Sequence, residues 1–204
     1  MDAILKNHLT NKKCNEAADI LSHAFMEHEF SKYIEPDITK RFKILKFIFE
    51  GTCKSINWFG CIQSNGNPPK GIFTWFPPHT YPLSNWQFIK SGSWKSPFKL
   101  SLKTINKTLT AFSFADKVKL DMLKDRPFWY LPYGGVLPEY QGKGIGTALI
   151  NQMHSHLDKN GEASTLEANS EKSVQFWSQY GYKVKVEAEV PGGGLYYYIM
   201  VRNF

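Results

Sequence analysis

The stretch GGVLPEYQGKGIGTALI, residues 134–150, joins an apolar strand to a helix through a glycine-rich turn. Before it, residues 128–131 are aromatic and apolar, which is typical of a buried strand. After it, apolar side chains recur every four positions from Ile145 to Leu157, which predicts a helix with one apolar face. The turn therefore lies at a helix N-terminus, where unpaired N–H groups and the helix dipole favour an anion.

Glycines at positions 142, 144 and 146 keep side chains away from the backbone of this turn, so a phosphate can contact the N–H groups directly. Lys143 is followed by glycine rather than by the Ser or Thr of a P-loop, and the G-x-G-x-G spacing differs from the G-x-G-x-x-G of a dinucleotide site. The full pattern, V-x-P-x-x-Q-G-x-G-x-G, resembles the acyl-CoA pyrophosphate loop of the GCN5-related N-acetyltransferase (GNAT) superfamily.

A second stretch, LEANSEKSVQFWSQYGY (residues 166–182), resembles the next strand and helix of this superfamily, which usually have L-E-A, a short polar loop and F-Y-x-x-x-G-[FY]. The resemblance implies an α/β protein of one domain, residues 1–204. Its sheet is expected to be mixed, mostly antiparallel, splayed and flanked by helices. A helical insertion is expected at about residues 79–127, before the fourth strand.

The N-terminal region favours a short first strand at residues 3–9 and then a helix whose buried face runs from Ala17 to Phe25. Asn11 or Asn15 is the expected cap of this helix. The polar and aromatic turn that follows contains His28, which in the superfamily would lie near the acceptor side of the groove. We favour an ordinary helix end for His28.

A second helix is predicted from Asp37 to about Lys54 by its helical spacing of apolar residues. Residues 58–63 and 71–76 then have the composition of two strands joined by a turn-rich hairpin loop. At the C-terminus, apolar and charged residues alternate over 182–190, and apolar residues alternate again over 195–201. These two segments predict a closing hairpin.

The expected insertion at 79–127 has helical spacing from Leu102 to Phe112 and many lysines. Such an insertion resembles the puromycin N-acetyltransferase-like branch, as do residues 126–131, which lead into the cofactor strand. One interpretation is a lid or wall over the acceptor pocket. The other is a solvated helical hairpin packed on the sheet.

The composition allows one sizeable core, since 42% of the 204 residues are hydrophobic and 15% are aromatic. The formal net charge of +7 favours anions such as coenzyme A. We find no basic run or nucleic-acid motif and no apolar stretch of about 18 residues, so neither nucleic acid nor membrane is an expected partner. Cys14, Cys53 and Cys61 lack metal-ligand spacing and suggest free thiols in a cytoplasmic protein.

The resemblance implies that Gly134, Gly135 and Val136 bind the pantetheine arm of acetyl-CoA. The residues that match its pyrophosphate loop are Gln141, Gly142, Lys143, Gly144, Ile145, Gly146 and Thr147. Asn169 and Ser173 would bond the pantetheine amides, or would cap the helix that begins near Ser170. Gly134 departs from the family, where a larger apolar residue is usual, and a glycine there could loosen the strand or widen the groove.

Glu167 is the leading candidate for the base that takes a proton from the amine, because a partly desolvated carboxylate has a raised pKa. Its alternative role is to bond loop backbone. Trp177 stands where the family usually has a tyrosine acid, and an indole N–H is far too weak an acid for that task. Either Tyr180 takes over, although it also suits a packing role, or solvent protonates the thiolate, or the protein binds coenzyme A without much turnover.

The leading hypothesis is an acetyl-CoA-dependent N-acetyltransferase, a monomer or homodimer, that acts on a primary amine of a small molecule or peptide in a ternary complex. The alternative is a non-catalytic acyl-CoA-binding regulatory module, suggested by Trp177. A dinucleotide-binding enzyme ranks last. Glu167 follows the glycines at about the spacing of a ribose-binding acid, but too little chain remains for a doubly wound sheet.

Overall fold

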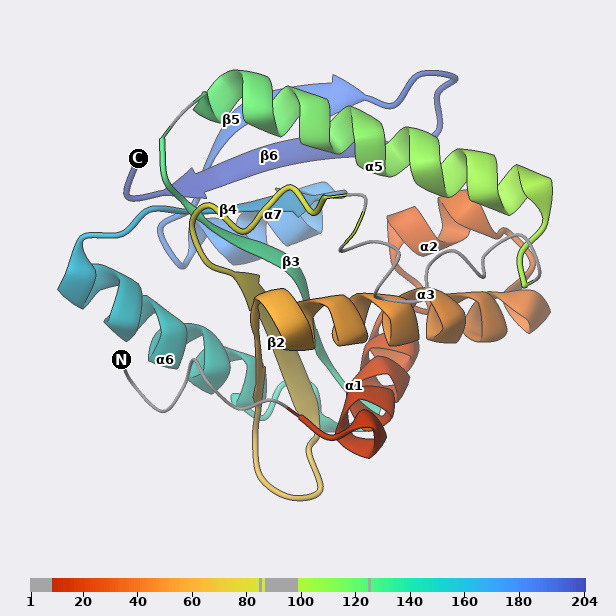
Figure 1. Cartoon of the computed structure of the whole chain (residues 1–204), viewed down its shortest axis with the longest axis horizontal. Coiled ribbons are helices and arrows are strands. Elements are labelled where there is room, and N and C mark those ends of the chain that lie inside the picture. Colours follow the sequence, from red (N-terminus) through yellow and green to blue (C-terminus); the bar gives the residue numbers. More distant parts are fainter. Residues whose placement is uncertain (1–8, 85, 87–98, 125) are drawn as a thin grey trace.

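The computed structural model describes residues 9–84, 86, 99–124 and 126–204 (Figure 1). Its helices are α1 (Asn11–Ala24), α2 (Glu29–Ile34), α3 (Ile38–Phe59), α5 (Leu102–Leu123), α6 (Ile145–Asn160) and α7 (Glu171–Ser178), with a short 3-10 helix at Pro138–Tyr140. Its strands are β1 (Cys61–Ser64), β2 (Gly71–Phe76), β3 (Trp129–Val136), β4 (Ser164–Ala168), β5 (Lys183–Glu189) and β6 (Tyr196–Arg202).

The strands form one six-stranded sheet in the order β1-β2-β3-β4-β6-β5. Neighbouring strands are antiparallel except for β3 and β4, which are parallel. The expected fold class, an α/β protein with a mostly antiparallel sheet flanked by helices, is confirmed. The long helix α5 precedes β3, the third described strand. The strand expected at residues 3–9 lies outside the described residues except for Leu9, which is not in a strand.

The sheet opens between its two parallel strands. β3 pairs with β4 from Trp129 to Leu131. Beyond that point Pro132 has no N–H to donate, while β4 continues its pairing with β6 as far as Ala168. β3 meanwhile stays paired with β2 up to Val136. Residues 132–136 therefore have no strand partner on the β4 side, and this is the expected splay.

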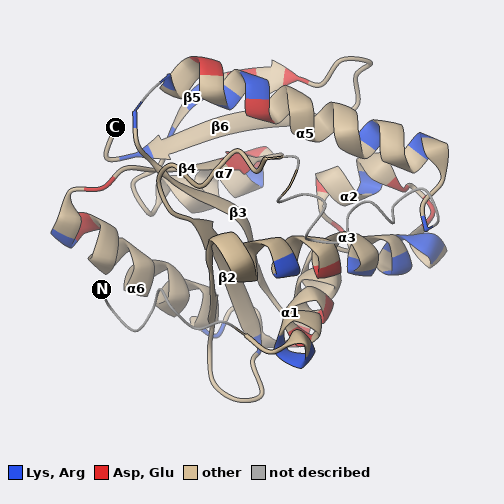
Figure 2. Cartoon of the chain, in the orientation of Figure 1, with Lys and Arg blue, Asp and Glu red and all other residues tan. Residues whose placement is uncertain are grey.

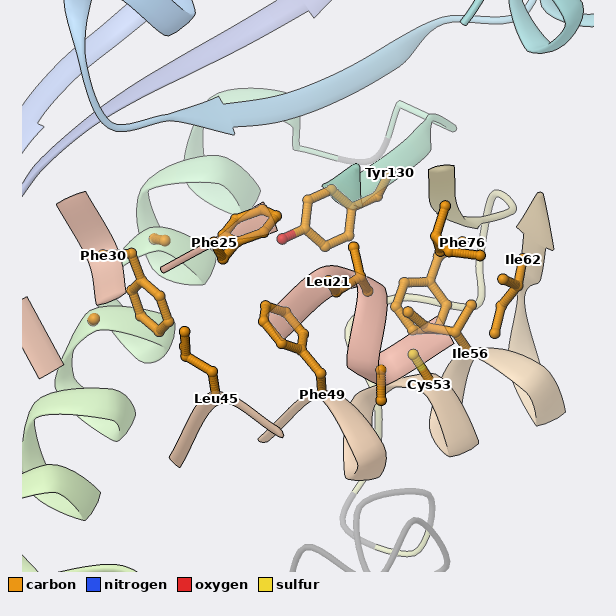
Figure 3. Packing of buried hydrophobic residues seen from close by; sticks show 14 of the residues in the cluster. Leu21, Phe25, Phe30, Leu45, Phe49, Cys53, Ile56, Ile62, Phe76 and Tyr130 are labelled. Atoms are coloured by element: carbon orange, nitrogen blue, oxygen red, sulfur yellow. The ribbon is translucent and has the colours of Figure 1, made fainter. Parts of the chain in front are cut away.

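Buried apolar side chains form two clusters, one on each face of the sheet. The first joins α1, α3 and α5 to the sheet, and Figure 3 shows part of it. The second lies under α6. Successive residues of β6 alternate between them, since Ile199 and Val201 belong to the first cluster and Met200 to the second.

The cap of α1 differs from the prediction. The Thr10 side chain accepts a hydrogen bond from the Lys13 N–H, while Asn11 and Asn15 lie inside the helix. The predicted helix itself is confirmed. The turn predicted after it is partly helical, because α2 forms over six residues and buries Phe30. Such a short helix leaves little periodic signal in a sequence.

Helix α3 is longer than predicted, and the assignment of Trp58 and Phe59 to a strand was wrong. Its apolar face stays buried as far as Ile56, so the helix continues to Phe59. Gly60 then lets the chain pass close to β2, because a Cβ at this position would lie 2.2 Å from the Trp75 carbonyl oxygen. The strand that follows, β1, is correspondingly short.

The described part of the insertion contains the long helix α5, which crosses above the sheet (Figure 1). The predicted helical spacing ended at Phe112, whereas α5 continues to Leu123. Beyond Phe112 its buried positions are Ala115, Lys119 and Leu123, and a lysine on the buried face breaks the apolar pattern. The expected features at residues 87–98 lie outside the described residues.

Basic residues outnumber acidic residues on α3, whereas α5 has residues of both signs (Figure 2). Across the described ranges, we find no helix that is long and apolar enough to cross a membrane. Cys14, Cys53 and Cys61 are free and buried, and burial raises the pKa of the Cys61 thiol to about 12. These thiols are therefore protonated and unreactive at neutral pH.

A buried polar network lies between α6 and the sheet. His154 Nε2 is 3.3 Å from Tyr182 Oη, which is 2.9 Å from Ser164 Oγ. Burial, and to a lesser extent the charge of Arg202, lower the pKa of His154 to about 4. The folded protein therefore keeps this imidazole neutral, whereas an unfolded chain takes up the proton near pH 6.5.

The free energy of unfolding should fall as the pH is lowered from about 6.5 to about 4, because the unfolded chain binds more protons in that window. His154→Gln should reduce this dependence by about half, because burial also lowers the pKa of His28 to about 4 and its contribution remains. His23→Gln, at an exposed position of α1, is the control. Urea unfolding of the three proteins at pH 7 and pH 5 measures the difference. An unchanged pH dependence in His154→Gln would contradict the assignment.

Candidate functional site

A cavity of about 1530 Å³ lies where β3 and β4 separate. The glycine turn and α7 form one end of it, and α1, α3 and α5 form the other. Every predicted cofactor-binding residue except Lys143 lines this cavity. These residues are Gly134, Gly135, Val136, Gln141, Gly142, Gly144, Ile145, Gly146, Thr147, Asn169 and Ser173.

The turn has the backbone geometry that its glycines predict. Gly142 and Gly144 have φ of +72° and +78°, in the left-handed region that favours glycine, and α6 begins directly afterwards. The side chain of Gln141 donates to the Val136 carbonyl oxygen at 3.1 Å, which holds the turn against the end of β3. The first N–H groups of α6 have no partner within the helix and lie at the cavity end.

Two lysines lie beside the turn without entering the cavity wall. Lys143 Nζ donates to the Glu139 carbonyl oxygen at 3.0 Å and lies 4.9 Å from the centre of the Tyr140 ring. Lys70 Nζ lies 4.7 Å from the same ring. Lys172 of α7 does line the cavity. Positive charge therefore surrounds the end of the cavity at which the helix dipole is also positive.

Gly134 neither loosens the strand nor widens the groove. It pairs with Phe73 of β2, and a Cβ on Gly134 would lie 2.4 Å from the Phe73 ring. A Cβ on Gly135 would lie 2.7 Å from Ala24 of α1. The two glycines thus allow close packing against β3 from both faces.

Asn169 and Ser173 hold the start of α7 at the cavity wall. Asn169 Nδ2 donates to the Tyr196 carbonyl oxygen at 2.7 Å, and the Ser173 N–H donates to the Oγ of Ser170, the helix cap. The alternative role expected for them, capping of this helix, is wrong, because Ser170 is the cap. Both residues line the cavity, and their contact with the pantetheine arm stays a prediction.

Trp177 lines the cavity and packs edge-on against Phe73 and Tyr182. Tyr180 is not among the described residues that line the cavity. Its hydroxyl lies 2.8 Å from Thr147 Oγ1, and Thr147 does line it. The phenol therefore reaches the cavity through one intervening hydroxyl group.

Glu167 of β4 lines the cavity and is ion-paired with Lys119 of α5, with Oε1 and Nζ 2.6 Å apart. The Glu167 side chain is 8% exposed and that of Lys119 is 0% exposed. Lys119 Nζ also lies 3.5 Å from the centre of the Tyr130 ring. The carboxylate proposed as a base is thus buried against a cation supplied by the insertion.

Asp116, one turn before Lys119 on α5, completes this group. Its Oδ1 lies 3.4 Å from Lys119 Nζ and accepts a hydrogen bond from the Tyr81 hydroxyl. Burial and the nearby carboxylates raise the pKa of Tyr81 and of Tyr130, so both phenols keep their protons. We call Asp116, Lys119, Glu167, Tyr81 and Tyr130 the acidic cluster, because its carboxylates outnumber its ammonium group.

His28 lies in the cavity wall next to Phe25, with a distance of 4.7 Å between the ring centres. Its backbone caps α2, as the expected helix end implies, although its side chain makes no capping bond. Burial lowers its pKa to about 4, so the imidazole is neutral at neutral pH.

The acidic cluster was largely missed by sequence reasoning, which found Glu167 alone. Asp116 and Lys119 have the spacing of an ordinary exposed ion pair on a helix. The only available signal was a lysine at a position where the helical period of α5 predicts burial. Its partner is 48 positions away in the sequence, so pairing follows from the fold alone.

Residues 127–204, which include the glycine turn and the two strands that separate, match the model of an acetyltransferase (GNAT) domain. An uncharacterized N-acetyltransferase of Schizosaccharomyces pombe is 28% identical over 115 residues. The match covers 55% of this chain and 47% of the relative, so it spans about half the length of that protein.

Solved structures share the fold over nearly the whole chain. A Corynebacterium glutamicum protein, described as histone acetyltransferase HPA2 and related acetyltransferase, is 19% identical with a TM-score of 0.66, covering 99% of this chain and 96% of its own. Arylalkylamine N-acetyltransferase 2 from Aedes aegypti is 12% identical with a TM-score of 0.58, covering 97% and 98%. Such identities show the fold alone. The puromycin N-acetyltransferase-like branch stays a prediction.

Removing the cation of the buried pair should be strongly destabilising. Lys119→Met leaves the Glu167 carboxylate buried without its partner, and we expect a loss of about 3–5 kcal/mol in the free energy of unfolding. Adding Glu167→Gln should recover most of this loss, because the unpaired charge is then absent. Chemical denaturation measures all three proteins.

The matched control is Lys46→Met, which removes the cation of a surface pair. Lys46 Nζ and Asp19 Oδ1 are 2.7 Å apart, but their side chains are 40% and 44% exposed. The expected loss is below about 1 kcal/mol. Equal losses in Lys119→Met and Lys46→Met would show that the buried pair is not needed for stability.

Proposed function

We propose that this protein is an acetyl-CoA-dependent N-acetyltransferase that acts on a primary amine of a small molecule or peptide. The observation that carries the proposal is the glycine turn at the start of α6, which faces a large cavity along the free edge of β3. We further propose that residues 1–204 act as one domain, as a monomer or homodimer, in the cytoplasm.

The cavity suits the cofactor in two ways. The open N-terminus of α6 and the side-chain-free turn favour a pyrophosphate, held by Gln141, Gly142, Lys143, Gly144, Ile145, Gly146 and Thr147. The backbone of Gly134, Gly135 and Val136, together with Asn169 and Ser173, would bond the pantetheine arm. Bound acetyl-CoA would supply the thioester whose acetyl group is transferred.

The proposed reaction is direct transfer in a ternary complex. The amine nitrogen attacks the thioester carbon, the C–N bond forms and the C–S bond breaks. One proton leaves the amine and one proton reaches the departing thiolate, so the products are an amide and a free thiol. A backbone N–H on the free edge of β3 would stabilise the carbonyl oxygen as negative charge develops on it.

Glu167 is the proposed acceptor for the amine proton, directly or through a water molecule. Its support is its place at the cavity wall on β4, with a carboxylate fixed by Lys119 at 2.6 Å. Tyr180 is the proposed donor to the thiolate, acting through the Thr147 hydroxyl 2.8 Å away. Solvent is the alternative donor.

Calorimetric titration with acetyl-CoA tests the proposed cofactor, with NAD as the comparison ligand. We expect stoichiometric binding of acetyl-CoA alone. Gly144→Ala should weaken it by about tenfold or more, because a Cβ in the turn obstructs the anion and disfavours the left-handed backbone.

Gly161→Ala is the matched control. Gly161 ends the same helix with φ of +64°, and a Cβ there would likewise have no neighbour within 4 Å. Both variants should lose about 1 kcal/mol of stability from backbone strain, but only Gly144→Ala should lose affinity. Absence of acetyl-CoA binding in the unmodified protein would remove the functional assignment while leaving the fold intact.

A second candidate function is a non-catalytic acyl-CoA-binding module, and Trp177 is the observation that favours it. If lack of an acid limits turnover, Trp177→Tyr should create or raise thiol release with a panel of amines. Trp177→Phe is the control, since it changes the ring without supplying a phenol. Equal rates of thiol release in the two variants would show that the lack of an acid at position 177 does not limit turnover.

A further inference from the structure

We propose that the end of the cavity remote from the glycine turn binds a small monoamine with an apolar, aromatic-sized body, and that Asp116 receives its ammonium group. This inference rests on the proposed function and narrows its acceptor class. The bound ammonium group releases one proton to solvent before the neutral amine attacks, and the transfer then releases the second proton from nitrogen. Polyamines and extended peptides are the competing classes. The charge of the site disfavours polyamines, and the binding experiment below tests peptides.

Several aromatic rings lie in the walls at this end. Phe30 of α2 stacks on Phe112 of α5, with ring centres 5.3 Å apart, and Tyr81 lies 4.4 Å from Tyr130. Other aromatic residues of the cavity lining include Phe25, Phe76 and Tyr133. The whole cavity, about 1530 Å³, exceeds the roughly 300–1,000 Å³ of ordinary ligand pockets, so it has room for an acceptor beside a cofactor arm.

Helices α2 and α5 contact each other at this end of the cavity. Besides the Phe30–Phe112 stack, Lys107 Nζ of α5 donates to the Tyr33 carbonyl oxygen of α2 at 2.5 Å. These contacts fix the positions of the two helices that contribute Phe30 and Phe112 to the wall.

The charge of the acidic cluster leaves one carboxylate available. Asp116 and Glu167 carry two negative charges and Lys119 carries one positive charge. Lys119 Nζ lies closer to Glu167, at 2.6 Å, than to Asp116, at 3.4 Å. The Asp116 side chain is 31% exposed, whereas Glu167 is 8% exposed, so Asp116 is the carboxylate that an incoming cation can reach.

Lys119 itself shows that these surroundings suit a primary ammonium group. Its Nζ is held between a carboxylate and the faces of Tyr130 and Tyr81, at 3.5 Å and 4.4 Å from their centres, with the side chain fully buried. An acceptor ammonium beside Asp116 and Tyr81 would meet the same kinds of group. Carboxylates and aromatic faces both stabilise an alkylammonium ion.

A second positive charge on the acceptor would be unfavourable. The other charged side chains that line this part of the cavity are Glu50, Lys54 and Lys99, which together add one positive charge. A polyamine bound through Asp116 would place its remaining cations among Glu50, Lys54 and Lys99, where the net charge is positive. A neutral apolar body is therefore the better match for the rest of the site.

Direct binding tests this inference separately from turnover. We would titrate the full chain with 2-phenylethylamine, spermidine, a short peptide with a free N-terminus, and 2-phenylethanol, each with and without coenzyme A. The expected order places 2-phenylethylamine at least tenfold tighter than the other three. The alcohol has the same body without the charge, so this contrast needs no protein variant.

Asp116→Asn should weaken 2-phenylethylamine binding about tenfold and leave acetyl-CoA affinity within about twofold. Asp121→Asn, at an exposed position of α5, should change neither. If the amine binds in this way but acetyl-CoA does not, the acceptor site stands and the proposed function fails. Tighter binding of spermidine or peptide, or an unchanged affinity in a folded Asp116→Asn, would overturn the inference.

Discussion

The separation of β3 from β4 is the constraint on which the rest of the site depends. The two strands pair as far as Leu131, after which Pro132 cannot donate and β4 remains paired with β6. β3 stays paired with β2 up to Val136, so it remains a strand although its edge toward β4 is unpaired beyond Leu131. The cavity, the approach to the glycine turn and the exposure of Glu167 to that cavity all follow from this opening.

Local signals predicted the elements beside the turn well. Left-handed backbone at Gly142 and Gly144 follows from the absence of a Cβ, and the start of α6 follows from the apolar period after it. Such features depend on residues that are close together in the chain, so they can be predicted from the sequence alone. The ends of helices were predicted less well where tertiary packing determines them. Helix α3, for example, continues through Trp58 because its buried face extends to Ile56.

The acidic cluster could not be predicted, because it depends on contacts between distant elements. Lys119 belongs to an insertion helix and Glu167 to a strand beyond the turn. The helical period of α5 predicts that Lys119 is buried, but it does not indicate the partner of this lysine. Gly134 is a related case. Its departure from the usual residue is explained by the ring of Phe73 on the neighbouring strand, which the sequence alone does not place there.

The position of Lys119 has a consequence for how this domain can change. Residues that would hold the cofactor lie within 127–204, while most walls of the other end come from earlier residues. The cofactor end and the acceptor end thus come from different parts of the chain. The ion pair between Lys119 and Glu167, with 2.6 Å between Nζ and Oε1, connects these two parts. Exchange of α5 for the helix of a relative would have to preserve a cation at position 119 or alter Glu167 in the same step. Evolution or engineering of a new specificity through α5 is thus limited to sequences that keep this cation, unless β4 changes as well.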